Sequence, residues 1–348
     1  MQRRRAPGGM CRLRAHTRTR GHTRARGHTH ARTHARTHAH THAHTHTRTH
    51  SMALAWREEA SGAMSLQATT SLALLAAARE GAGDRDEAVQ LLERCVAIAR
   101  AHFPDAEGHG EIASRLVQLA NTVKEAGDWA RARALLEEAS QMFVASVGYM
   151  HPQMAGVLSG LAAVAQEEGD FDRALILHQQ SLGIKKERLG AQHASVATSL
   201  VNMARTHEKL GDLATAVELR IEALSIVRAS LGENHPQTAI MLNNVSVLEA
   251  RRGNYAEAAA FVQEALAIDE AVFGENHPQV AADLNTLATL AFHCGEKHLA
   301  RQLYERAVAI RREALGDEHV RTRASRKNLD LVKAQIAADD AADDGAGQ

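Results

Sequence analysis

The chain has 348 residues, no formal net charge, 45% hydrophobic residues and only 3% aromatic residues. This composition favours helices packed through Ala and Leu over an aromatic-filled sandwich or barrel. The three scattered cysteines (Cys11, Cys95 and Cys294) contain no CxxC pair and indicate neither a disulfide framework nor a zinc cluster. No run approaches the roughly 20 apolar residues that span a bilayer, and residues 1–50 lack the apolar stretch of a secretory signal. We therefore expect a cytoplasmic protein without membrane contact.

The basic residues are concentrated at the N-terminus. Residues 1–50 carry 12 arginines and no acidic residue, which leaves 29 basic against 41 acidic residues in the rest of the chain. The acidic remainder argues against nucleic-acid binding there, because phosphate contacts need clustered positive charge.

From His16 to His50 the chain alternates His or Arg with Thr, Ala or Gly, and we expect residues 1–51 to form a disordered low-complexity segment. The segment is consistent with a translated simple nucleotide repeat that precedes a start at Met52. Metal capture by its imidazoles, nucleic-acid contact through its arginines and self-association through its histidines are open alternatives. A transit peptide is disfavoured, because an alternation of period two gives a helix no apolar face.

Two glycine motifs then recur with a step of 42 residues. A Gly-x-x-His motif occurs at Gly148/His151, Gly190/His193, Gly232/His235, Gly274/His277 and Gly316/His319. A second series with the same step comprises Gly127, Gly169, Gly211, Gly253 and Gly295, followed five residues later by Ala132, Ala174, Ala216, Ala258 and Ala300. Self-similarity at a fixed period predicts one supersecondary unit stacked on copies of itself.

Each repeat reads as a helical hairpin. In the copy that starts at His235, Pro236 suits the first position of a helix, and His235 stands at the cap position before it. The first helix should end before Gly253, and the second should run from about Tyr255 to Val272 and be terminated at Gly274. The expected apolar stripe of the first helix comprises Ala239, Ile240, Met241, Val245, Leu248 and Ala250.

Six hairpins fit the chain, within a folded part that we place at residues 52–338. They cover residues 65–103, 109–147, 151–189, 193–231, 235–273 and 277–315, and a closing helix starts at His319. The first hairpin is out of frame at Gly83 and Ala88, as expected for a capping repeat. Residues 339–348 are expected to form an acidic disordered tail.

The stretch Gly253-Asn254-Tyr255-x-x-Ala258 resembles the tetratricopeptide repeat, and so does the small-residue slot at Ala139, Ser181, Ala223, Ala265 and Ala307. The Leu231-Gly232-x-x-His235-Pro236 linker is similar to the long-period, kinesin-light-chain-like form. HEAT or armadillo repeats, whose period is close, are the second choice. The resemblance implies an all-α, right-handed superhelical solenoid of antiparallel helix hairpins.

The resemblance also implies a site, because the first helix of each tetratricopeptide hairpin lines a concave face that holds an extended peptide. The predicted groove residues are Gln118, Asn121, Asn202, Arg205, Lys209, Asn243, Asn244, Arg251, Asn285, Lys327 and Asn328. In the same register, Lys124, Thr286 and His293 are also expected on this face. Asn amides pair with a peptide backbone irrespective of its side chains, and the basic residues would select an acidic segment. The third hairpin interrupts this pattern with Ser159 and Gly160, which leaves either a dry wall or a pocket.

No catalytic motif or insertion interrupts the repeats, so we expect no enzyme and no cofactor. The repeated histidines should cap and pack the linkers. Hairpins about 10–20 Å apart hold them too far from one another to share a metal. The sequence thus predicts a non-enzymatic adaptor that binds a peptide segment of another protein. A self-associating structural solenoid, or a metal or nucleic-acid tether acting through the N-terminal segment, is the alternative.

Overall fold

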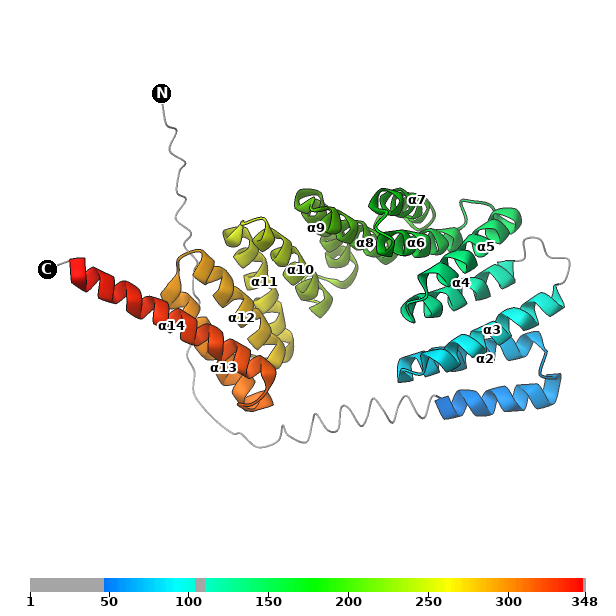
Figure 1. Cartoon of the computed structure of the whole chain (residues 1–348), viewed down its shortest axis with the longest axis horizontal. Helices are drawn as coiled ribbons and strands as arrows, with labels where there is room; N and C mark the ends of the chain where they lie inside the picture. Colours follow the sequence, from blue (N-terminus) through cyan, green and yellow to red (C-terminus); the bar gives the residue numbers. More distant parts are fainter. Residues whose placement is uncertain (1–46, 104–109, 347–348) are drawn as a thin grey trace, which may run out of the picture. The chain divides into compact units, whose positions relative to one another are not determined.

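The computed structural model describes residues 47–103 and 110–346, and every regular element within these ranges is a helix (Figure 1). These residues fall into two compact units, one that ends at Ile226 and one that begins at Val227. No helix in the described part of the chain is both long enough and apolar enough to cross a membrane. Residues 1–46, where most of the predicted low-complexity segment lies, are outside the described residues.

The first unit is a stack of helix pairs. It contains a helix over residues 47–61, α2 (Leu66–Ala82), α3 (Arg85–His102), α4 (Gly110–Glu125), α5 (Trp129–Val147), α6 (Pro152–Glu167), α7 (Phe171–Leu189), α8 (Ala194–Leu210) and most of α9 (Leu213–Leu231). The pairs α2/α3, α4/α5 and α6/α7 form hairpins, and each packs on the first helix of the next pair.

The helix over residues 47–61 was not predicted. Its Leu54 is buried in a cluster with Leu72 of α2 and Ile98 of α3. The expectation of disorder up to residue 51 is therefore wrong for residues 47–51, because apolar side chains downstream in the same helix give it a surface to pack on.

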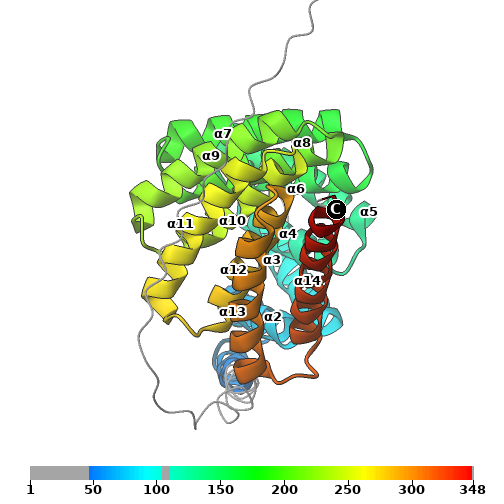
Figure 2. The same ribbon diagram turned by 90° about the vertical axis from the view of Figure 1, so that its left-hand side faces the viewer.

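The second unit continues the pattern from the end of α9. It contains α10 (Pro236–Arg251), α11 (Tyr255–Phe273), α12 (Pro278–His293), α13 (Lys297–Leu315) and α14 (Val320–Ala346), and Figure 2 views it from the side of α14. Helix α14 continues to Ala346, so the expected disordered tail from residue 339 is wrong for the described residues. Alanine favours helix there, and Asp339 forms an ion pair with Lys297 of α13.

The repeated histidines cap the first helices, as predicted. In each repeat the Nδ1 atom accepts the backbone N–H two residues further on, at 3.1–3.3 Å for His151, His193, His235, His277 and His319. The His277 ring also stacks on Phe273, with ring centroids 4.7 Å apart. The helix ends are set by glycines with positive φ, such as Gly253 (φ 86°), where a side chain would be strained.

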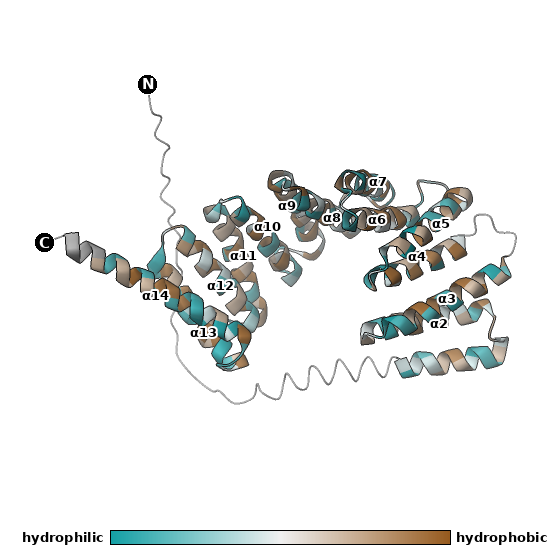
Figure 3. Cartoon of the chain, viewed as in Figure 1, coloured by the Kyte–Doolittle hydropathy of each residue, from teal (hydrophilic) through white to brown (hydrophobic). Residues whose placement is uncertain are grey.

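The small slots lie in the core, and Figure 3 shows how hydrophobic and hydrophilic residues alternate along the helices. Each residue of both predicted series is fully buried: Ala132, Ala174, Ala216, Ala258 and Ala300, and Ala139, Ser181, Ala223, Ala265 and Ala307. One prediction about the core is wrong: Ile240, which we expected in the apolar stripe of its helix, is 48% exposed. It shares a helix face with Asn244 and with Val247, which is 53% exposed, so this face of α10 points away from the core.

Candidate functional site

A cavity of about 370 Å³ opens in the first unit where α6 lacks large side chains. Gly160 stands 42 residues from both Gln118 and Asn202, so it occupies the position at which neighbouring repeats carry an amide. The predicted gap at Ser159 and Gly160 is thus a pocket and not a dry wall. The residues around it are Asn121, Lys124, Trp129, Gly156, Ser159, Gly160, Ala163, Gln166, Glu167, His178, Asn202 and Arg205.

Two pairs of predicted groove residues flank the cavity. On α4, Lys124 Nζ donates to Asn121 Oδ1 at 3.2 Å, and on α8, Arg205 Nη2 donates to Asn202 Oδ1 at 3.1 Å. Each amide therefore directs its carbonyl oxygen to a cation and keeps its NH₂ group as a donor. The structure brings these four residues, from two first helices, to one cavity.

His178 of α7 lines the same cavity and was not predicted. It is 1% exposed, and neither ring nitrogen has a hydrogen-bond partner among the described residues. Burial, followed by the positive charges of Lys185 and Arg205, lowers the pKa of His178 to about 4. The ring is therefore neutral at pH 7, and it presents one N–H donor and one acceptor that the protein leaves unused.

The charges around the cavity favour an anion. The residues that line the cavity include two basic ones, Lys124 and Arg205, and one acidic one, Glu167. Burial lowers the pKa of Lys124, and an opposing carboxylate would offset that cost of desolvation. Lys185, beside the cavity, donates to Ser199 at 2.7 Å, and burial lowers its pKa too.

The other predicted groove residues do not line this cavity. In the first unit, Gln118 accepts from Arg115 at 3.2 Å, and Lys209 is exposed near the end of α8. In the second unit, Asn244 is half-buried and Arg251 is exposed on α10.

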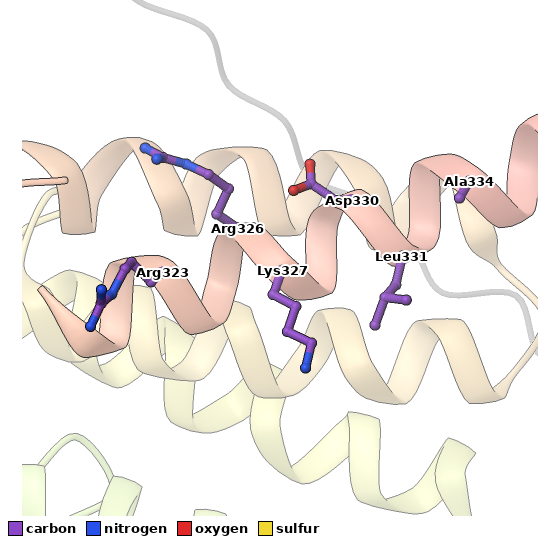
Figure 4. A pocket seen from close by; sticks show the side chains of 6 residues that line it. All are labelled: Arg323, Arg326, Lys327, Asp330, Leu331 and Ala334. Atoms are coloured by element: carbon purple, nitrogen blue, oxygen red, sulfur yellow. The ribbon is translucent and has the colours of Figure 1, made fainter. Parts of the chain in front are cut away.

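The last two predicted residues lie on α14, where Asn328 is half-buried and Lys327 is exposed. Lys327 borders a shallow hollow of about 490 Å³ that α14 residues line. Figure 4 shows Lys327 and Leu331 pointing to one side of the helix, and Arg326 and Asp330 to the other.

Asn243 and Asn285 hold neighbouring repeats together. Asn243 Nδ2 donates to Asp283 Oδ1 at 2.8 Å, and Asn285 Oδ1 accepts from Ser325 Oγ at 2.8 Å. Each bond joins residues 40 positions apart, which places Asn243 against α12, the first helix of the next hairpin, and Asn285 against the closing helix α14. Asn243 thus commits its NH₂ group to Asp283, whereas Asn285 accepts through Oδ1 and keeps its NH₂ group as a donor. The prediction of Asn243 as a free groove donor is corrected, because position along the repeat did not distinguish the groove face from the adjoining stacking face.

A signal for His178 was present in the sequence. The residues at the same repeat position are Leu136, Val262 and Tyr304, all buried in the core, and Arg220, which pairs with Glu208 at 2.6 Å. A histidine among core residues departs from the pattern of its own chain. The groove was predicted from the first helices alone, and His178 lies on the second helix of its hairpin.

A family model described as "Tetratricopeptide repeat" matches residues 111–187, 153–219, 195–271 and 238–313, and a second model of that description matches residues 71–102. The chain belongs to the tetratricopeptide repeat family. The predicted all-α tetratricopeptide solenoid is confirmed. A search among curated proteins finds no relative.

Solved structures with kinesin-light-chain-like repeats share the fold. BtubC (BKLC) from P. vanneervenii has a TM-score of 0.56 at 24% identity, with 68% of this chain and 93% of that chain covered. A putative kinesin light chain from Podosopora anserina, with nearly identical TPR-like repeats, has a TM-score of 0.54 at 24% identity, with 60% of this chain and 98% of that chain covered. The predicted kinesin-light-chain-like character is confirmed at the level of fold.

Proposed function

We propose that this protein is a non-enzymatic adaptor, and that its first unit binds an extended peptide segment whose acidic side chain enters the cavity at Gly160. Tetratricopeptide hairpins form protein-interaction scaffolds, which gives the general class. The cavity beneath Lys124 and Arg205 is the single observation that carries the more specific proposal.

Three physical features support a peptide ligand with a carboxylate. Lys124 and Arg205 offer charge-assisted hydrogen bonds, which are about twice as strong as neutral ones. Asn121 and Asn202 offer amide donors to the backbone on either side of the anchoring residue. His178 is buried with no hydrogen-bond partner in the described part of the chain, and it would gain one from the bound carboxylate or backbone.

The test is selection from a random peptide library displayed on phage, with the full chain as bait. We expect enrichment of Asp and Glu at one anchor position, and weaker binding of the enriched peptides as salt is raised. Affinities of synthetic versions, measured by fluorescence anisotropy, should fall in Lys124→Gln and Arg205→Gln and change little in Lys186→Gln.

Lys186 is a matched control, because it loses the same charge at a site outside the cavity, where it pairs with Glu222 at 3.0 Å. Peptides that carry no acidic residue, or an equal loss of affinity in all three variants, would reject the cavity as the binding site. Selection of no peptide at all would reject the adaptor function as stated.

A further inference from the structure

Two aspartates are buried between successive hairpins of the second unit. Asp269 on α11 and Asp283 on α12 are each 2% exposed. The preceding repeat carries Val227 and Met241 at the same two positions, 42 residues earlier. Phe143 and Val157 are likewise apolar at these positions, whereas Lys185 with Ser199 and Arg311 with Ser325 form hydrogen-bonded pairs there. A pair of carboxyl groups is therefore particular to this joint.

The geometry leaves the pair short of hydrogen-bond donors. Asp283 Oδ1 accepts from Asn243 at 2.8 Å, whereas Oδ2 is buried with no partner among the described residues. The carboxyl groups of Asp269 and Asp283 lie in hydrogen-bonding contact, and Gln279 contributes a further hydrogen bond to Asp269. Two carboxylates cannot donate to each other, so a proton on one of them is what completes this arrangement.

We propose that Asp269 and Asp283 share one proton, and that this proton makes the stacking of hairpin α10/α11 on hairpin α12/α13 dependent on pH. The protonated pair is a neutral-to-anionic hydrogen bond that fits a buried interface. Once the proton is lost, two buried negative charges face each other, and the hairpins separate more readily. This inference does not rest on the proposed peptide site, which lies in the other unit.

The groups around the pair do not remove this requirement for a proton. Asn243 of α10 is neutral, and Glu270 of α11 adds a negative charge that raises the pKa of Asp283 further. His277, at the start of α12, acts in the opposite direction and lowers the pKa of Asp269. Arg306 of α13 forms its ion pair with Glu270, at 2.7 Å, and not with the buried pair.

The sign of the pH effect follows from the raised pKa values. Burial is the largest cause for both groups; it raises the pKa of Asp269, and it raises the pKa of Asp283 from 3.8 to about 7. The folded pair therefore holds a proton that the unfolded chain releases at about pH 4. Its stabilising contribution is complete below that pH, declines as pH rises, and is lost once pH passes about 7.

The test compares the full chain with the isosteric variant Asp283→Asn, whose amide can accept from Asn243 and donate to Asp269 without a proton. Hydrogen exchange read by mass spectrometry reports the opening constant of peptides from α10 to α12. We expect the ratio of wild-type to variant opening constants to rise by about tenfold per pH unit between pH 5 and 7, and then to level off.

Two further variants separate this mechanism from general effects. The apolar pair Asp269→Val with Asp283→Met restores what the preceding repeat carries and should also remove the pH dependence. Asp330→Asn, which changes an exposed carboxylate of the same unit, should leave the wild-type pH dependence unchanged. A ratio of opening constants that stays constant from pH 5 to 8.5 would overturn the proposal.

The wild-type chain gives an independent measurement that needs no variant. Carboxyl ¹³C resonances of the chain labelled at Asp should include one that titrates near neutral pH. If every Asp carboxyl group titrates below pH 5, the pair shares no proton and the proposal fails.

Discussion

Replacement of Gly160 by alanine tests how closely α6 packs against Leu136 of α5, beside the cavity. A Cβ atom at this position would lie 2.9 Å from Leu136 Cδ1 and 3.2 Å from Cδ2, closer than carbon atoms normally approach. Leu136 is 1% exposed, so its side chain has little space into which to move. Overpacking of this kind costs about 1–3 kcal/mol, whereas Gly→Ala inside a helix gains about 1 kcal/mol. We expect Gly160→Ala to lower the free energy of unfolding by up to about 2 kcal/mol.

Gly156 provides a matched control one helical turn away on α6. A Cβ atom there meets no atom within 4 Å, so Gly156→Ala should raise the free energy of unfolding by about 1 kcal/mol. Urea unfolding of the full chain, followed by circular dichroism and by hydrogen exchange of α5 and α6, measures both variants. If Gly160→Ala stabilises the protein as much as Gly156→Ala does, Leu136 does not pack against Gly160 as described.

Three further changes test single contacts. Asn243→Ala should destabilise the second unit by about 1–3 kcal/mol, because Asp283 loses its donor, while Asn244→Ala should change its urea midpoint little; equal effects would contradict the assignment. His178→Leu introduces the residue that an earlier repeat carries at this position, and it should stabilise the first unit. The lowered pKa of His178 makes the wild-type protein more stable as pH rises from 4 to 6.5, and the variant should lose this pH dependence. Melting temperatures measured across this pH range will show both effects. His235→Ala should lower the free energy of unfolding by about 1 kcal/mol because it removes the cap on α10, whereas His235→Asn should keep most of the wild-type stability. An unchanged melting temperature in the alanine variant would refute the capping role.

Most of the fold could be predicted because each repeat specifies itself locally. One hairpin contains the helix cap at His235, the positive φ at Gly253 and the buried small residue Ala258. The 42-residue period repeats the same local determinants of structure in the other hairpins. Predictions failed where the period was broken, at the helix over residues 47–61 and at the extension of α14 to Ala346. In these segments the helix depends on contacts of single residues such as Leu54, and the repeat pattern does not predict those contacts.

The candidate site was predicted in part. The four cavity residues Asn121, Lys124, Asn202 and Arg205 were named from the repeat register, because a common helix face is a property of spacing. His178 was not, since it comes from the second helix of its hairpin and reaches the cavity only through the packing of α7.

The sequence by itself determined the hairpins, their caps and their period, since these depend on residues less than about one repeat apart. Only the tertiary structure decided which amides are free and which are committed. Asn243 and Asn244 are adjacent in sequence, yet the first holds Asp283 of the next hairpin and the second does not. The reason is physical: a rotation of about 100° per residue separates the groove face from the stacking face. What meets each face depends on residues brought together from about 40 positions away.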